Sequence, residues 1–314
     1  MDSAAALIAV RFALYLDLML VFGLPLFCLY TLRGAERRAG GNVMSSRVVV
    51  GLALAGVALS VLGLLLLAAA MSDVPVLQLD RETLGALLDG TAIGTAGKVR
   101  VAALLAALPI GFWLRSRPSA LWATLSCLGA IALGSLAWTG HGAADEGAIG
   151  QIHLTADIVH LLAAGVWIGA LAGLLTLLSR VRVSSDDRQE RMALAHRALA
   201  GFSTAGTLAV GLIILTGLVN SWVLVGVGNI ASLPGSLYGR LLILKLLIFV
   251  GMLGLAGWNR FRLTPAVEAS LGTSDATAAM QSIRWSVALE STLALSVLGL
   301  VAWLGTLAPP ASGS

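Results

Sequence analysis

Apolar runs of about twenty residues recur along the whole chain, and they constrain its fold more than any other feature. A helix of that length and character is what is needed to cross the hydrocarbon core of a bilayer. Charged residues make up only 11% of the 314 positions, whereas a soluble domain carries about 25%. We therefore expect an all-α, polytopic transmembrane bundle with eight spanning helices, at about residues 4–30, 47–71, 98–115, 119–139, 153–179, 197–226, 239–258 and 283–307.

Basic residues are concentrated in four connections that fall on the same side of an eight-helix chain. These connections hold 14 of the 20 Lys and Arg residues. Cytoplasmic loops of membrane proteins carry an excess of Lys and Arg, so this side is expected to be cytoplasmic and both termini periplasmic. The net charge of +4 is thus a topology signal, and the expected partner is the lipid bilayer, not nucleic acid. The 14 residues are Arg33, Arg37, Arg38, Arg47, Arg115, Arg117, Arg180, Arg182, Arg188, Arg191, Arg197, Arg260, Arg262 and Arg284.

The chain is expected to form one integral membrane domain over residues 1–314, since the connections between apolar runs are short. The stretch "GTAGKVR" is not a phosphate loop, because Ala92 replaces its first Gly and Val99 its Ser or Thr. ATP is therefore not expected as a substrate. No catalytic residues are predicted, and the chain is not expected to be an enzyme.

Two histidines and a carboxylate interrupt the fifth apolar run, "HLTADIVHLLAAGVWIGAL". On a helix that turns about 100° per residue, His153, Asp157 and His160 fall within roughly 60° of one another, and Trp167 continues that face. His153 and His160 are about 10 Å apart along the axis, so two overlapping pairs, His153 with Asp157 and Asp157 with His160, are each candidates to share an ion. A further ligand must come from another helix.

His141 is the candidate for that ligand, because it ends the fourth run in "WTGHG" and only about a dozen residues separate it from His153. Ionisable groups inside a membrane are functional-site candidates by default, so we interpret His141, His153, Asp157 and His160 as a metal site open to the outside. Two alternatives remain. The His–Asp pair could be purely structural, or Asp157 could orient a histidine ligand without binding the metal itself. Imidazole and carboxylate suit Zn(II), Cu(II), Ni(II) or Fe, and they do not select copper.

Further charges lie inside the other apolar runs. Arg11, Asp17, Lys245 and Glu290 are deep enough that pairing among them is expected, and they are candidates for an ion or proton path. Arg100 and its neighbour Lys98 are near the start of a run, where long basic side chains can snorkel to the interface. A stripe of small residues, Gly165, Gly169 and Gly173, is expected to pack the fifth helix closely against a neighbour.

Several motifs in order resemble the CopD/PcoD family of bacterial inner-membrane copper-resistance proteins. They are "TGHG", "HLTADIVHLLAAGVWIGAL", "GFSTAG…LTGLVNSW", "YGRLLILKLLIFVGMLGLAGWNRFRLTP" and "IRWSVALESTLALSVLGLVAWLGTLAPP", and the resemblance is strongest over about residues 135–310. It implies an eight-helix protein that helps move copper ions from periplasm to cytoplasm. The family's positions fall on His141, His153, His160, Lys245, Glu290, Asn259 and Arg260.

The resemblance also implies a periplasmic copper-binding partner. No CopC-like domain is fused to this chain, so that partner is expected to be a separate protein. The leading hypothesis is a copper permease of the inner membrane that uses no ATP. The alternatives are a b-type cytochrome with haem between axial histidines, and a non-transporting subunit that docks another protein.

Overall fold

The computed structural model describes residues 3–38, 45–140, 147–180, 188–270 and 276–313. Eight helices in these ranges are long and apolar enough to cross a membrane, and the described residues contain no β-strand. This confirms the expected all-α bundle with eight spanning helices. They are α1 (Ser3–Thr31), α3 (Ser46–Ser72), α5 (Ala92–Trp113), α6 (Pro118–Gly134), α7 (Gly147–Arg180), α8 (Arg188–Val225), α9 (Leu237–Trp258) and α11 (Ala276–Leu304).

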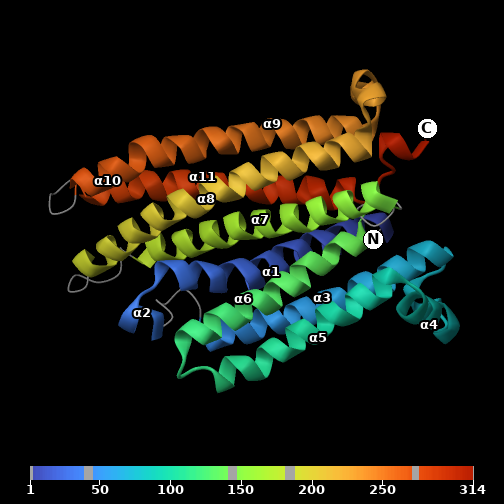
Figure 1. The fold of residues 1–314 in the computed structure, drawn as a ribbon, viewed down its shortest axis with the longest axis horizontal. Helices are drawn as coiled ribbons and strands as arrows, with labels where there is room; N and C mark the ends of the chain where they lie inside the picture. Colours follow the sequence, from blue (N-terminus) through green and yellow to red (C-terminus); the bar gives the residue numbers. More distant parts are fainter. Residues whose placement is uncertain (1–2, 39–44, 141–146, 181–187, 271–275, 314) are drawn as a thin grey trace.

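The long helices run alternately up and down, so the two termini lie at the same end of the bundle (Figure 1). We call this end, where α1 begins, the N-terminal end. Helix α1 packs against α3, α6 and α7, while α7 also packs against α8 and α11, and α11 against α9. The two central helices α1 and α7 thus join an N-terminal half, built with α3, α5 and α6, to a C-terminal half built with α8, α9 and α11.

Short elements connect the long helices. At the N-terminal end these are the 3₁₀ helix η2 (Val76–Gln78), α4 (Arg81–Gly90), the 3₁₀ helix η3 (Ser135–Thr139) that extends α6, η5 (Val227–Gly235) and η7 (Pro310–Gly313). At the opposite end lie α2 (Gly34–Arg38), a π-helical turn η6 (Asn259–Leu263) and α10 (Thr264–Ser270), the last two continuing α9.

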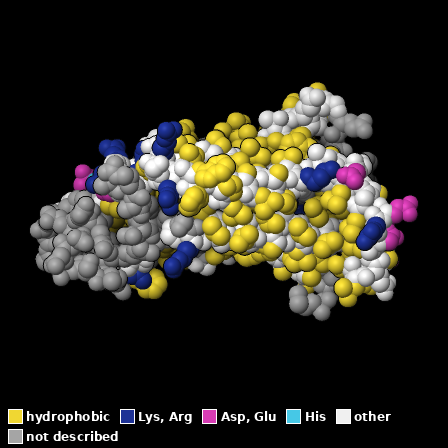
Figure 2. Space-filling view, turned by 90° about the horizontal axis from the view of Figure 1, so that it is seen from below, with side chains coloured by type: hydrophobic (Ala, Val, Ile, Leu, Met, Phe, Trp, Pro, Cys, Tyr) yellow, Lys and Arg dark blue, Asp and Glu magenta, His cyan; other side chains and the backbone are white. Residues whose placement is uncertain are grey.

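Charge is distributed unevenly between the two ends. Figure 2 shows a broad hydrophobic band around the middle, with most Lys and Arg side chains toward the end opposite the termini and acidic side chains mainly at the other end. We call the end opposite the termini the arginine-rich end. The structure thus gathers the basic connections on one side of the bundle, as the sequence predicts; its orientation in a membrane remains a prediction.

Several helix ends differ from the predicted ones. The third spanning helix begins at Ala92, not at 98, because the Thr91 hydroxyl caps it by accepting the backbone N–H of Gly94 at 3.0 Å. Gly94 also lets α4 fold back on α5, since a Cβ at Gly94 would lie 2.3 Å from the carbonyl oxygen of Leu87. The fifth helix begins at Gly147, and the seventh span continues through the π-helical turn to Ser270.

The glycine stripe of α7 packs against α1, as expected from its spacing. A Cβ at Gly169 would lie 2.3 Å from the carbonyl carbon of Gly23 on α1, and one at Gly173 would lie 2.4 Å from the Phe27 ring. The two backbones therefore approach as closely as small residues allow. This contact fixes the position of α7, which carries the candidate site.

Candidate functional site

A line of polar side chains follows one face of α7 into the bundle. It starts with His153, which is 1% exposed, and continues through Asp157 and His160 to Trp167, which is also buried. At 1.5 Å per residue the line covers about 21 Å between His153 and Trp167. The face predicted from the helical spacing is therefore turned toward the interior of the protein.

His160 is oriented by α8. Its Nδ1 lies 2.9 Å from the hydroxyl oxygen of Thr216, and that hydroxyl donates its own proton to the carbonyl of Leu212 at 2.6 Å. The Thr216 oxygen can then only accept, so we assign the ring proton of His160 to Nδ1. This tautomer leaves the Nε2 lone pair free, which is the form of imidazole that binds a metal ion.

Asp157 lies between α8 and α9. Its Oδ1 accepts a hydrogen bond of 3.4 Å from the Asn220 amide of α8, and its charge interacts with those of His153 and Lys245. Lys245 of α9 also interacts electrostatically with His160. The amide oxygen of Asn220 is buried and has no hydrogen-bond partner in the described ranges. The Asp157 carboxylate is therefore in contact with Asn220, and Lys245 is near enough to interact with it electrostatically.

Glu290 of α11 closes the other end of the line. It is 1% exposed, and its two oxygens accept hydrogen bonds from Trp167 Nε1 at 2.7 Å and from the Asn259 amide at 3.0 Å. Phe249 packs edge-on against the Trp167 ring. Asn259 begins the π-helical turn, and its amide oxygen is buried without a partner in the described ranges. The polar line thus leads from His153 to a buried carboxyl group at the middle of α11.

Replacing Trp167 with Phe tests this second cluster. The change removes the donor to Glu290 while leaving an aromatic ring, so one buried carboxylate oxygen loses its partner. We expect the variant to be less stable by about 1–3 kcal/mol, the cost of an unsatisfied buried polar group. The check is the Tm of purified protein, compared with the Trp222→Phe variant, whose side chain is 54% exposed on α8. Equal Tm values for Trp167→Phe and Trp222→Phe would contradict the hydrogen bond between Trp167 and Glu290.

The structure brings together only part of the predicted metal site. Among the described residues, no three His, Cys, Asp or Glu side chains are grouped closely enough to hold one ion. His141 lies outside the described residues. The residue before it, Gly140, is next to Asp157, since a Cβ at Gly140 would lie 4.0 Å from Asp157 Oδ2. The four-residue site remains a prediction.

The expected pairing among the deep charges is wrong. Within the described ranges, no ion pair within 4.0 Å involves Arg11, Asp17, Lys245 or Glu290. Glu290 is satisfied by neutral donors, and Asp17 faces α3, with its Oδ2 only 2.5 Å from where a Cβ of Gly56 would be. Asp17 therefore lies away from the line on α7, and the Arg11 guanidinium lies beside Gly305, the residue that follows α11. The packing of the helices keeps these four charged groups apart from one another.

Arg100 also contradicts the expected snorkelling. Its neighbour Lys98 does reach the surface and pairs with Asp89 at 3.0 Å. Arg100 instead is 2% exposed and turns inward, where its Nε donates to the Ser135 hydroxyl at 2.8 Å. The difference arises because residues two apart on a helix point in different directions.

The histidines that the structure describes do not favour a haem site. His153 and His160 are on the same helix, and His196 is near the start of α8 at the arginine-rich end, 3.7 Å from Glu268. Axial haem ligation in a bundle requires histidines on facing helices at similar depth. The described histidines do not provide such a pair.

Thr216 and Asn220 were not predicted from the sequence as site residues, although their spacing indicates such a role. They are four residues apart in the apolar run of α8, and this spacing places them on one face of the helix. Two polar residues on one face of a spanning helix indicate a polar partner on the neighbouring helix.

Eight spanning helices, with imidazole and carboxylate groups on one face of the central helix α7 and polar groups of α8 and α9 beside them, define a polytopic integral membrane protein. The comparisons with known proteins then specify the class. Residues 1–151 match the model of the copper resistance protein D-like N-terminal domain, and residues 196–304 match that of copper resistance protein D. The chain belongs to the copper resistance protein D family.

Three curated relatives show how far the similarity extends. Copper resistance protein D of Pseudomonas syringae pv. tomato is 45% identical over 303 residues, which is 96% of each chain. The inner membrane protein YebZ of Escherichia coli K12 is 29% identical over 55% of each chain. The copper transport protein CutJ of Bacillus subtilis 168 is 36% identical over 41% of this chain and 22% of its own. No solved structure matches.

Proposed function

We propose that the protein is a copper permease of the bacterial inner membrane, which moves copper ions from periplasm to cytoplasm along the polar face of α7. The observation that carries the proposal is the line from His153 to Glu290, buried in the bundle of a family named for copper resistance. The chain is a transporter in this proposal, not an enzyme, and copper is its substrate.

Copper enters at the N-terminal end, which the positive-inside rule orients toward the periplasm. His141 follows Gly140, which is beside Asp157, so its imidazole is the best candidate to complete a site with His153 and Asp157. A separate CopC-like periplasmic protein would deliver the ion at this mouth. Neutral imidazole nitrogens and a carboxylate are suitable ligands for copper.

The next step inward is His160. Its assigned tautomer presents Nε2 as a free ligand, and it is about one helical turn from Asp157. The Lys245 ammonium competes for Asp157, so a copper ion there is held less tightly than in a closed four-ligand cage. Conduction requires sites that bind well enough to receive an ion and weakly enough to release it.

Glu290 and Asn259 are the innermost groups of the path, at the middle of α11 and at the end of α9. A carboxyl group and an orphaned amide oxygen are acceptors for a cation that leaves His160. Release then occurs at the side that the positive-inside rule makes cytoplasmic. The described residues of the path belong to α7, α8, α9, η6 and α11.

The Asp157→Asn variant tests this function. It keeps the size of the side chain but removes the charge that both entry pairs share. We expect copper accumulation through the protein to fall by about 10–100-fold, the range found when a metal site loses a supporting group. The measurement is cellular copper at equal protein levels, with Asp89→Asn, an exposed acid at the same end, as control. Normal accumulation in the Asp157 variant would exclude the proposed path.

A further inference from the structure

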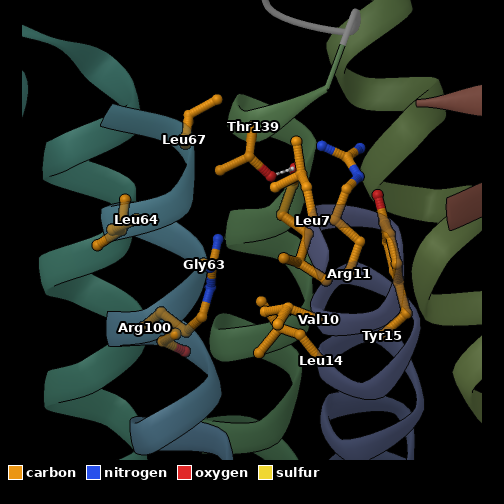
Figure 3. A pocket seen from close by; sticks show the side chains of 12 residues that line it. Leu7, Val10, Arg11, Leu14, Tyr15, Gly63, Leu64, Leu67, Arg100 and Thr139 are labelled. Carbon is orange, nitrogen blue, oxygen red and sulfur yellow. Dashed lines mark hydrogen bonds between the residues drawn. The ribbon is translucent and has the colours of Figure 1, made fainter. Parts of the chain in front are cut away.

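A second polar site lies in the N-terminal half, away from the copper path. A partly open cavity of about 40 Å³ is lined by residues of α1, α3, α5 and η3. Half of its lining residues are leucine or valine, but the side chains of Arg11, Tyr15, Ser60, Arg100 and Thr139 also line it. Figure 3 shows Arg100 on one side of this space, and Arg11 and Tyr15 on the other. Its lining includes no acidic residue.

Arg100 has a hydrogen-bond donor at this cavity that no described residue accepts. Its two hydrogen bonds, from Nε to the Ser135 hydroxyl and from Nη2 to the Ser135 carbonyl at 3.2 Å, leave Nη1 without a partner among the described residues. The side chain lies eight residues into α5, about 12 Å below the helix start. A guanidinium group remains protonated even when buried, so this charge needs a compensating one.

Arg11 adds a second positive charge to the same wall. It lies eight residues into α1, and its buried Nε has no hydrogen-bond partner in the described ranges. Neither arginine forms an ion pair with a described carboxylate. Two guanidinium groups that line one cavity repel each other, and desolvation makes both more costly.

The hydroxyl groups show which donors are available. Ser60 already donates to the carbonyl of Gly56 at 2.6 Å, and Thr139 to that of Leu136 at 2.7 Å. The Tyr15 hydroxyl has no such bond among the described residues, and its charge interaction is with Arg100. The free donors at the cavity therefore come from Arg11, Tyr15 and Arg100, on two opposite sides.

We propose that this cavity binds a small monovalent inorganic anion of chloride size, which offsets one of the two positive charges of Arg11 and Arg100. About 40 Å³ holds roughly three water-sized particles, so one halide ion fits in it. The anion accepts hydrogen bonds from both guanidinium groups and from Tyr15. It joins α1 to α5 and stabilises the N-terminal half.

The test is the Tm of the full-length protein in detergent, measured while sodium chloride replaces sodium gluconate at constant ionic strength. We expect a saturable rise of several degrees with chloride and with bromide. In Arg11→Gln and Arg100→Gln the half-maximal chloride concentration should increase by more than about tenfold, because each loses a charged hydrogen bond. Tyr15→Phe, which removes one hydroxyl only, should show a smaller increase. Arg81→Gln, an exposed arginine at the same end, is the control.

Three outcomes would overturn the proposal. One is an equal Tm of the wild type in chloride and gluconate. Another is a chloride response that is unchanged in both Arg11→Gln and Tyr15→Phe, which would identify an adventitious ion only. The third is a Tm that rises with phosphatidylglycerol but not with chloride, which would assign the two arginines to a lipid headgroup. None of these results depends on copper transport.

Discussion

Cells that carry the His153→Ala, His160→Ala double variant are expected to accumulate copper only to the level of cells without the protein. The two imidazoles are the nitrogen ligands at successive steps of the path, and both are turned into the bundle. Their loss leaves Asp157 with Lys245 and no imidazole on α7 to receive the ion. Cellular copper, measured by elemental analysis at matched growth and matched protein level in the membrane, is the readout.

The matched control is His196→Ala. This histidine is at the arginine-rich end of α8 beside Glu268, away from the proposed path. It should leave copper accumulation unchanged. Normal accumulation in the double variant, with a normal amount of protein in the membrane, would contradict the role assigned to both histidines.

The Gly169→Leu variant is expected to prevent the protein from reaching its folded state. Even a Cβ at this position would lie 2.3 Å from the carbonyl carbon of Gly23, and the obstacle is backbone, which cannot rotate away. Overpacking a core costs about 1–3 kcal/mol when side chains can adjust, so a clash of the new side chain with the Gly23 backbone should cost more. The measurement is the yield of monodisperse protein after extraction from the membrane, together with its Tm.

Gly211→Leu provides the control for this prediction. Gly211 is on α8, and nothing lies within 4 Å of a Cβ at that position. A normal yield and a normal Tm are expected for Gly211→Leu. If Gly169→Leu were as abundant and as stable as Gly211→Leu, the close contact between α1 and α7 would be wrong.

The eight helices could be predicted because each depends on a local property of the chain. Exposing an apolar run of about twenty residues to water is unfavourable, so the run is placed in the bilayer. In lipid, only a helix lets the backbone N–H and C=O groups of a single segment form their hydrogen bonds. The face of α7 that carries His153, Asp157 and His160 could also be predicted, since it follows from the rotation of about 100° per residue. The spacing of Gly165, Gly169 and Gly173 predicted a close contact but not the partner helix.

Helix ends and buried charges could not be predicted in the same way. The start of α5 depends on a cap by Thr91 and on α4 folding back over Gly94. Arg100 is buried because η3 brings Ser135 next to it, and the hydropathy of the sequence does not predict this contact. The same holds for Glu290, whose partners Trp167 and Asn259 come from two other helices.

The candidate site was predicted only as far as a single helix. The ladder on α7 is visible in the sequence, but Thr216, Asn220 and Lys245 join it because of how α8 and α9 are rotated against α7. Helix rotation is set by packing over the whole contact, and no short motif encodes it. His141 lies outside the described residues, so its place in the site is still a prediction.

Copper flux into proteoliposomes tests the central claim most directly. Purified wild-type protein is reconstituted in vesicles that contain a copper-responsive dye, copper is added outside, and the rate of signal increase is compared with that of the His153→Ala, His160→Ala double variant. The account predicts a saturable flux for the wild type and none above empty vesicles for the double variant. Equal fluxes for the two proteins would show that copper does not cross along α7.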